Sequence, residues 1–338
     1  MVNEKISIND VAKLAKVSVT TVSRVINNIS TVSDKNRTKV EEAVRALKYR
    51  PNVSAQRLAR GHNNAIGLVI PGYPGVFHSF YAIELIRGIG HALEAAKMDM
   101  VFHITDGNNP INTNHVDGVI FADIIENRKQ VEAAINIGTP VLIINNEVHD
   151  IDVNYIAIDN TLGGQLVAEY LLGFGHRKIA TITGKLTTQA GQNRLNGFKE
   201  YLEKNNGGLP AHYIIEGDYS RRSARLAAEE FLKMKDRPTA IFAASDDMAL
   251  EAIAFFLEKG LKIPEDISVI GFDDNPTCLF GPVALTTVHQ PLFQMAEEAV
   301  KMLVNAISKK NHSKTKKILI PELVVRETCC APRPERTA

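Results

Sequence analysis

Two pairs of adjacent acids, Asp246-Asp247 and Asp273-Asp274, are the side chains of this sequence that are best suited to chemistry. Each pair follows a short apolar run, AIFAAS or SVIGF, which is typical of a buried strand. As catalytic groups the acids would need a metal ion or a matched acid and base. As ligand-binding or structural residues they need nothing more. The pairs therefore leave catalysis and ligand binding open.

The familiar enzyme motifs are missing from the sequence. The run GIGHAL (88–93) lacks the third glycine of a dinucleotide-binding loop and lies within a helical pattern. There is no Gly-x-Ser-x-Gly, no His-Glu-x-x-His and no P-loop. The three cysteines, Cys278, Cys329 and Cys330, fit neither a disulfide framework nor a metal-ligand pattern. We therefore expect no enzymatic activity, no cofactor and no metal.

The composition is that of a soluble protein with more than one domain. The chain has 338 residues, of which 45% are hydrophobic and 23% charged. No apolar run reaches the ~18 residues that span a bilayer, and the N-terminus has no apolar signal core. Together with the odd cysteine count, this favours a cytoplasmic protein without membrane contact.

Positive charge is concentrated in the first part of the chain. Residues 1–60 contain 12 Lys and Arg against 5 Asp and Glu, a net charge of +7, whereas the whole chain carries +1. The rest of the chain is therefore acidic. This pattern favours a head that binds a polyanion, although a solvated basic surface would have the same charge.

Residues 7–47 have the sequence pattern of three short helices. Ser7, Ser18 and Ser33 are suited to cap them, and apolar residues recur at helical spacing after each serine, at 11–15, 22–26 and 40–47. The first two helices are joined by a very tight turn at Lys16-Val17. This arrangement indicates a helix-turn-helix domain.

The second helix has a composition that is typical of a strand. In VSVTTVSRVIN (17–27), five of the first six residues are Val or Thr. The cap at Ser18 and the helical spacing of the valines outweigh this weak preference. The N-terminal part of such a helix enters the DNA major groove. There Val19 and Thr20 could contact base edges, and Arg24 could read guanine or hold a phosphate.

The segments ISINDVAKLAKVSVTTVSRVIN and VSDKNRTKVEEAVRALKYRPNVSAQRLA resemble the bacterial lactose-repressor/galactose-repressor family over positions 6–60. The resemblance implies base reading by Val19, Thr20 and Arg24. It also implies a hinge helix at 53–59, in which Leu58 wedges between bases of the minor groove with Ala55 beside it. Further DNA-binding candidates, mostly for backbone contacts, are Ser7, Thr21, Ser23, Asn27 and Asn52.

After residue 64, apolar strands alternate with amphipathic helices. We expect strands at 65–71, 100–105, 116–122, 141–146, 155–159, 178–184, 213–216, 240–244 and 267–273, and helices at 77–96, 127–137, 162–172 and 190–205. This alternation predicts a doubly wound α/β body of two similar lobes with parallel sheets.

The body resembles the effector domain of the same family, through DNTLGGQLVAEYLLGFGHRKIATITG, PTAIFAASDDMALEA, IPEDISVIGFDDNP and ALTTVHQPLFQMA. That domain folds like a periplasmic sugar-binding protein, and its chain crosses between lobes three times, here near 160, 290 and 320. The implied division is a helix-turn-helix domain at 1–50, a hinge and linker at 51–62, an effector domain at 63–328 and a tail at 329–338. Lobe 1 would comprise 63–159 and 291–318, and lobe 2 would comprise 160–290 and 319–328.

A ligand is expected in the cleft between the lobes, at the carboxyl ends of the strands. The candidates carried over from the family are Phe80, Tyr81, Asn145, Arg194, Tyr219, Ser245, Asp246, Asp273 and Gln290. Arg194 and Asp273 suit the paired hydroxyls of a sugar, but they could also form a salt bridge between lobes. The aromatic residues could stack on a sugar ring or pack in the core.

One segment departs from the family. Only ten residues, DGNNPINTNH (106–115), connect two strands of the first lobe. A parallel crossover usually needs a dozen or more residues with a helix, and the family has a helix there, close to its dimer contact. We expect a loop instead, because the segment is rich in Asn and contains Pro110.

These observations predict a ligand-responsive repressor of carbohydrate-utilisation genes. It would bind a pseudo-palindromic operator in double-stranded DNA as a homodimer. The C-terminal TCCAPRPERTA has no heptad repeat, which favours a dimer over a tetramer. Control by a phosphorylated carrier protein or by a nucleobase remains an alternative, as does a binding protein with a vestigial head.

Overall fold

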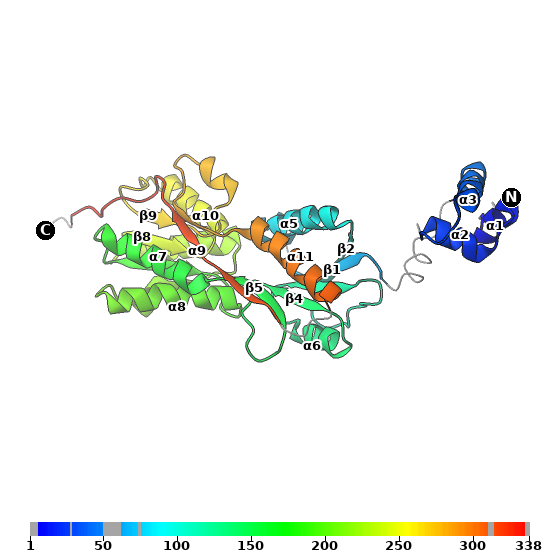
Figure 1. The fold of residues 1–338 in the computed structure, drawn as a ribbon. Coiled ribbons are helices and arrows are strands. Elements are labelled where there is room, and N and C mark those ends of the chain that lie inside the picture. Colours follow the sequence, from blue (N-terminus) through cyan, green and yellow to red (C-terminus); the bar gives the residue numbers. More distant parts are fainter. Residues whose placement is uncertain (1–5, 28, 50–61, 74–75, 310–313, 335–338) are drawn as a thin grey trace. The chain divides into compact units, whose positions relative to one another are not determined.

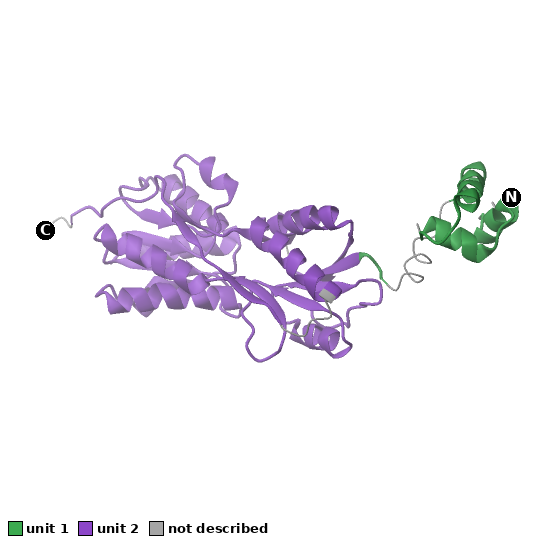
Figure 2. Ribbon diagram, in the orientation of Figure 1, with its two compact units in different colours: residues 1–64 green, residues 65–338 purple. Residues whose placement is uncertain are grey.

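The computed structural model describes residues 6–27, 29–49, 62–73, 76–309 and 314–334. The chain divides into two compact units, residues 1–64 and 65–338, which we call the head and the body (Figure 2). The hinge helix expected at 53–59 lies outside the described residues. Within the described part of the chain, no helix is both long and apolar enough to cross a membrane.

The head contains the three helices that the sequence predicts: α1 (Ile8–Ala15), α2 (Val19–Ile26) and α3 (Asp34–Leu47). Lys16 ends α1 in the left-handed region, with φ 52°, which lets the chain turn into α2 within three residues. Val11, Val22 and Val40, one from each helix, are completely buried. The head therefore has a small apolar core of its own.

The first lobe of the body is a six-stranded parallel sheet in the order β11-β5-β4-β3-β1-β2. Its strands are β1 (Ala65–Pro71), β2 (Asp99–Thr105), β3 (Gly118–Ala122), β4 (Val141–Ile144), β5 (Asn154–Ile158) and β11 (Lys316–Leu319). Helices α5 (Phe80–Ala96) and α11 (Leu292–Lys309) lie side by side on one face, and α6 (Arg128–Asn136) lies on the other (Figure 1). A short 3-10 helix, η1 (Val76–His78), precedes α5.

The second lobe is a four-stranded parallel sheet in the order β7-β6-β8-β9. Its strands are β6 (Ile179–Thr183), β7 (Ile214–Glu216), β8 (Ala240–Ala243) and β9 (Ser268–Ile270). Helices α7 (Asn160–Gly173) and α8 (Gln189–Lys204) form one layer, and α9 (Arg221–Lys233) and α10 (Asp246–Glu258) form the other (Figure 1). The 3-10 helices η2 (Ala211–Tyr213) and η3 (Pro276–Leu279) lie in connections.

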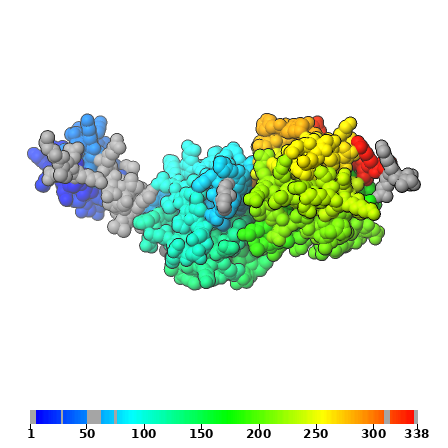
Figure 3. Space-filling model, turned by 180° about the vertical axis from the view of Figure 1, so that it is seen from behind, coloured from blue at the N-terminus to red at the C-terminus, as the bar shows by residue number. Residues whose placement is uncertain are grey.

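The chain passes between the two sheets at three places. It leaves β5 for α7 at Asp159, and it leaves β10 (Thr287–His289) for α11 at residues 290–291. It returns from β11 to β12 (Glu322–Val324) at residues 320–321, where β12 pairs antiparallel with β10. The two lobes adjoin each other in the space-filling view (Figure 3).

The fold class predicted from the sequence is confirmed: a helical head precedes an α/β body with two parallel sheets. The elements expected over 65–205 are present, with ends that differ by a few residues. The sequence analysis placed no element at α9, α10, α11 or β10 to β12.

The unusual crossover is a loop, as the sequence indicates. Residues 106–117, between β2 and β3, contain no helix. Ile111 and Val116 of this loop pack on the face of the sheet that α6 also covers. Val101 of β2 remains 41% exposed, so the loop covers the edge of the sheet only in part.

Helices α7 and α8 pack unusually close because glycines lie at their contact. A Cβ atom added at Gly197 would lie 1.9 Å from the carbonyl oxygen of Thr161, and one added at Gly164 would lie 2.2 Å from that of Arg194. Both obstacles are backbone atoms, which cannot rotate away. The close approach brings the start of α7 against the middle of α8.

We expect Gly197→Ala to lower the free energy of unfolding by about 1–3 kcal/mol, because α7 and α8 must separate to admit the methyl group. Urea unfolding of the full chain measures this change. Gly173→Ala, at the end of α7, is the matched control, because an added Cβ there meets nothing within 4 Å. Equal effects of the two substitutions would contradict the proposed steric cause.

Candidate functional site

The N-terminal cap of α2 determines which of its residues face outward. The Oγ atom of Ser18 accepts a hydrogen bond from the backbone N–H of Thr21 at 3.1 Å and so caps the helix. Val22 and Val25 are buried against the head core. The opposite side of the same helix therefore faces away from the core.

Val19, Thr20 and Arg24 are exposed on that outward side, as the sequence predicts. Val19 is 40% exposed, although it is apolar. Two short β-branched side chains beside a guanidinium form a surface that can approach base edges closely. This exposure is the property that a groove-facing helix requires.

The other DNA-binding candidates of the head are partly buried or form hydrogen bonds within the head. Thr21 and Ser23 are half-buried, and the Nδ2 group of Asn27 donates to the Oγ of Ser23 at 3.4 Å. Ser7 donates from both its N–H and its Oγ to the carboxylate of Asp10, and these bonds lower the pKa of Asp10. Asn52, Ala55 and Leu58 lie outside the described residues.

The first lobe places an acid and an amide on the side where the sequence predicts the cleft. Asp123 follows β3 and Asn145 follows β4, so both side chains lie at the carboxyl edge of the sheet. The Nδ2 group of Asn145 donates to the Oδ2 of Asp123 at 3.1 Å. Both residues adopt positive φ angles, 67° at Asn145 and 81° at Asp123, which are uncommon for residues other than glycine.

Asp123 was not among the residues selected from the sequence. Its side chain is buried, and burial raises the pKa of the carboxyl to about 6, although hydrogen bonds from Asn145 and the N–H of Ile124 oppose the rise. The position directly after the apolar run VIFA is the signal that could have identified it, because ligand residues are expected at the carboxyl ends of strands.

The second lobe contributes Arg194, whose guanidinium is almost completely buried. Its Nε donates to the Oδ1 of Asn160 at 2.8 Å, and its Nη1 donates to the carbonyl oxygen of Ala244 at 2.6 Å. The guanidinium stacks on the ring of Phe272, 3.7 Å from its centroid. These contacts fix the guanidinium in place beside the cleft.

Asp273 lies next to Arg194, with 3.8 Å between the Oδ1 and Nη1 atoms. The two residues belong to the same lobe, so the expected salt bridge between lobes is wrong. Gln290, at a crossing between lobes, donates from its Nε2 to the Oδ1 of Asp273. Burial raises the pKa of Asp273 to about 8, against the opposing effect of Arg194.

Aromatic side chains line the same region. The Tyr219 ring lies against Gly184, where an added Cβ would be 2.2 Å from it, and its hydroxyl lies 3.3 Å from the Oγ1 of Thr188. Burial raises the pKa of Tyr81 well above its ordinary value and raises that of Tyr73 as well. Tyr73 was not selected from the sequence. The charges of Asp123 in the first lobe and Asp273 in the second also raise its pKa.

Two of the predicted ligand residues have structural partners. Ser245 caps α10 by accepting a hydrogen bond from the N–H of Met248 at 3.4 Å. Asp246 is completely buried and accepts hydrogen bonds from the N–H of Asn275 at 2.7 Å and the Oγ1 of Thr287 at 2.5 Å. In this conformation these bonds tie Asp246 to the loop after β9 and to β10, and its charge contributes to the raised pKa of Asp273. Phe80 is half-buried and packs against the core of the first lobe.

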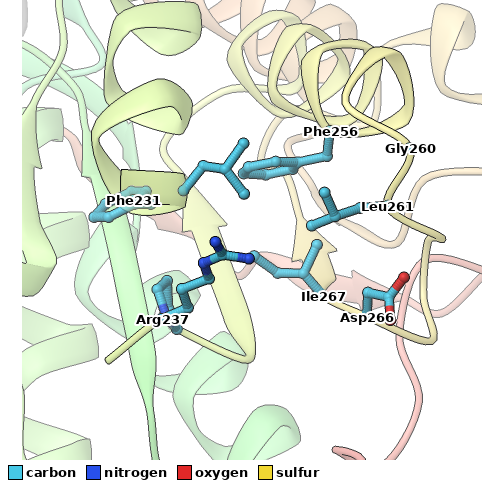
Figure 4. A pocket seen from close by; sticks show the side chains of 9 residues that line it. Phe231, Arg237, Phe256, Gly260, Leu261, Asp266 and Ile267 are labelled. Carbon is cyan, nitrogen blue, oxygen red and sulfur yellow. The ribbon is translucent and has the colours of Figure 1, made fainter. Parts of the chain in front are cut away.

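A surface pocket of about 340 Å³ lies elsewhere in the second lobe (Figure 4). Phe231, Phe256 and Leu261 are among its apolar lining residues, and Arg237 also lines it. Its lining includes Pro238 and Ile267, which precede β8 and β9, whereas the cleft residues follow the strands. The pocket is therefore at the opposite end of the sheet. None of the described residues form a cluster of three or more His, Cys, Asp or Glu that could hold a metal.

Comparison with known families identifies both parts of the chain. Residues 7–52 match the model for "Bacterial regulatory proteins, lacI family", and residues 168–329 match the model for "Periplasmic binding protein-like domain". The HTH-type transcriptional regulator DegA of Bacillus subtilis is 36% identical over 337 residues, which cover 96% of this chain and 98% of DegA. The ribose operon repressor of Haemophilus influenzae is 30% identical, with 95% of this chain and 98% of that protein covered.

Solved structures show the same architecture. The Lac repressor dimer bound to operator and the anti-inducer ONPF is 29% identical, with a TM-score of 0.85 over 97% of this chain and 100% of that chain. A complex of the transcriptional regulator CelR with cellobiose is also 29% identical, with a TM-score of 0.73 over 96% and 100% of the two chains.

We expect Asp123→Asn to stabilise the protein at high pH. The pKa of the Asp123 carboxyl is about 6 in the folded chain and 3.8 in the unfolded chain. The free energy of unfolding therefore falls as the pH rises from about 4 to 6. A change of this size corresponds to roughly 3 kcal/mol. The variant should therefore be more stable than the natural chain above pH 7 and equally stable near pH 4.

Urea unfolding at a series of pH values measures this difference. In the variant, the amide of Asn145 can turn and offer its oxygen to the new side-chain N–H group. Asp152→Asn, at an exposed position of the same lobe, is the control and should show no such gain. A stability gain from Asp123→Asn that is the same at pH 4 and pH 8 would contradict the titration.

Proposed function

The chain belongs to the lacI family of bacterial regulatory proteins, and from that premise we propose that it represses transcription as an operator-bound homodimer that responds to a small molecule. The outward face of α2 is the observation that supports operator binding most directly. Val19, Thr20 and Arg24 are exposed there, on a helix whose other side packs into the head. We assign base reading to these residues and minor-groove contact to Leu58 and Ala55 of the hinge.

The response to a ligand follows from the cleft. Both lobes provide polar groups to it, Asp123 and Asn145 from the first lobe and Arg194 and Asp273 from the second. A molecule that contacts both lobes binds the closed arrangement better than an open one, and this difference in affinity is the source of allostery. The cellobiose complex of a relative supports a carbohydrate as the ligand.

The lobes also touch directly near the cleft. The side chain of Gln189, at the start of α8, accepts a hydrogen bond from the N–H of Glu147 at 2.7 Å and donates one to its carbonyl oxygen at 3.0 Å. Because Glu147 belongs to the first lobe and Gln189 to the second, these bonds form only when the lobes are close together. They are part of the contact that a change in closure would alter.

Exposed apolar side chains support the homodimer. Leu279 is 58% exposed and Phe280 is 81% exposed in the loop after β9. Large apolar side chains of this kind, adjacent on a surface, are typical of a protein interface. The Lac repressor structure, which is a dimer, supports a two-fold assembly of this chain.

We expect Arg24→Ala to weaken binding to a specific operator, selected from random DNA, by about 10-fold to 100-fold, because a good base contact contributes about 1–3 kcal/mol. Fluorescence anisotropy at fixed salt measures the affinity, since salt alone changes it strongly. Arg45→Ala is the matched control, because it removes the same charge from an exposed position of α3. Equal losses of operator affinity from both substitutions would mean that Arg24 contributes only its positive charge and no base contact.

We expect Phe280→Asp to shift the protein from dimer to monomer, because the substitution places a charge where an apolar side chain would be buried between subunits. Sedimentation velocity at micromolar concentration measures the assembly state, and circular dichroism checks the fold. Ile137→Asp is the control, at a 68% exposed position after α6. A Phe280→Asp variant that stays dimeric would place the interface elsewhere.

A further inference from the structure

Asn160 lies where the chain first crosses from one lobe to the other. It begins α7 in the second lobe and comes two residues after Ile158, which ends β5 in the first lobe. The residue between them, Asp159, has a φ of −72° and a ψ of 81°, which belong to neither a regular helix nor a regular strand. Hinges between rigid parts are residues of this kind, whose torsion angles absorb the rotation. A rotation of the lobes at this crossing therefore changes the torsion angles of Asp159.

The side-chain amide of Asn160 is buried and bonds to both lobes. Its Oδ1 accepts a hydrogen bond from the Nε of Arg194 in the second lobe at 2.8 Å. Its Nδ2 donates to the carbonyl oxygen of Ile158 in the first lobe at 3.3 Å. This orientation of the amide is unambiguous, because arginine can only donate and a carbonyl oxygen can only accept. One side chain thus spans the crossing residue and connects the guanidinium to the end of β5.

The guanidinium of Arg194 is held by the second lobe and has to move with it. Its Nη1 donates to the carbonyl oxygen of Ala244, and its flat face lies on the ring of Phe272. The carbonyl of Ile158 belongs to a strand and moves with the first lobe. A change at the crossing therefore pulls the two partners of the Asn160 amide apart, and the amide keeps both bonds in only one arrangement of the lobes.

The residue type at position 160 agrees with a role in both lobes. A carboxylate is a stronger partner for a buried guanidinium than a neutral amide is. An aspartate, however, has no hydrogen-bond donor for the carbonyl oxygen of Ile158 when it is ionised. Asparagine has the same size and serves both partners, so the bond to the first lobe is part of what this position provides.

The second crossing between the lobes has a similar tie. Gln290 lies between β10 and α11, and its Nε2 donates to the Oδ1 of Asp273. Its backbone N–H also donates to the carbonyl oxygen of Asp273, at 3.4 Å. Because Asp273 lies beside Arg194, each of these two neighbouring charged residues is bonded to an amide side chain at a different crossing.

We propose that Asn160 is a positioning residue that couples the orientation of Arg194 to the angle between the lobes. When the lobes rotate at Asp159, the amide of Asn160 loses one of its two bonds, so the guanidinium and the crossing change together. A molecule that binds Arg194 then acts on lobe closure through Asn160. This regulatory meaning rests on the proposed response to a small molecule, whereas the coupling itself is a property of the chain without a ligand.

The contact between Glu147 and Gln189 provides a readout of lobe closure. The backbone N–H of Glu147 in the first lobe donates to the Oε1 of Gln189 in the second lobe at 2.7 Å. Amide protons exchange with deuterium from the solvent through local openings, so the exchange of this proton reports the separation of the lobes. The N–H of Ala244 donates to the carbonyl oxygen of Ile182 within the second lobe, and its exchange reports the stability of that lobe alone.

The substitution Asn160→Asp separates the two bonds, because it keeps an acceptor for Arg194 and removes the donor to Ile158. We expect exchange of the Glu147 amide to rise at least about 5-fold, the effect of one lost hydrogen bond. Exchange of the Ala244 amide should stay unchanged, since the guanidinium remains paired. Hydrogen exchange with mass spectrometry at single-residue resolution, on the full chain without ligand, measures both. Asn160→Ala, which removes both bonds, should raise exchange at both amides.

Two further variants calibrate the measurement. Gln189→Ala removes the acceptor of the Glu147 amide directly and sets the largest increase that lobe separation gives. Asn154→Asp is the matched control. The Nδ2 of Asn154 donates to the carbonyl oxygen of Val141 at 3.2 Å, and its Oδ1 accepts from the N–H of Thr315 at 2.9 Å. The same chemical change is thus made in a buried amide that joins segments of the first lobe only, and exchange of the Glu147 amide should not change.

Three results would overturn the coupling. The first is a Glu147 amide that exchanges at its natural rate in Asn160→Asp. The second is an equal rise in the control Asn154→Asp. The third is a rise by the same factor at Glu147 and Ala244 in Asn160→Asp, which would give Asn160 a purely structural role. None of these measurements uses a ligand, so a failed search for an effector removes the regulatory meaning and leaves the coupling in place.

Discussion

The buried guanidinium of Arg194 is the group on which the order of the cleft depends. A charge removed from water must be hydrogen-bonded, and removing one partner of such a charge typically costs about 3–5 kcal/mol. Asn160 and the carbonyl of Ala244 supply those partners, and Phe272 supports the flat face. Each partner comes from a different segment. The position of one side chain therefore fixes the start of α7, the end of β8 and the loop after β9 relative to one another.

The close packing of α7 and α8 makes this arrangement possible. Arg194 lies on α8 and Asn160 begins α7, so their hydrogen bond requires the two helices to be in contact. Gly164 and Gly197 allow that contact because a side chain at either position would strike a backbone carbonyl. The packing of these two helices thus decides where the guanidinium of Arg194 lies.

The expected cleft contains several groups whose burial disfavours stability. It contains acids whose pKa values are raised by burial and polar atoms without partners. Such features persist where a protein must bind something, because the ligand supplies the missing interactions. The first lobe adds a further irregularity in the loop at 106–117, which contains no helix and leaves Val101 of β2 partly exposed.

The sequence by itself determined the local structure. Serine caps and the spacing of valines were enough to predict the three helices of the head and the outward position of Val19, Thr20 and Arg24, because these features depend on residues a few positions apart. The tertiary structure alone decided the rest. Asp123 lies beside Asn145, Asp246 accepts hydrogen bonds from Asn275 and Thr287, and Asp273 lies beside Arg194 within its own lobe, because each outcome depends on which strand ends meet. Contacts between residues distant in the chain are set by packing. The position after the run VIFA marks Asp123 as a candidate, but it does not record which side chains Asp123 meets.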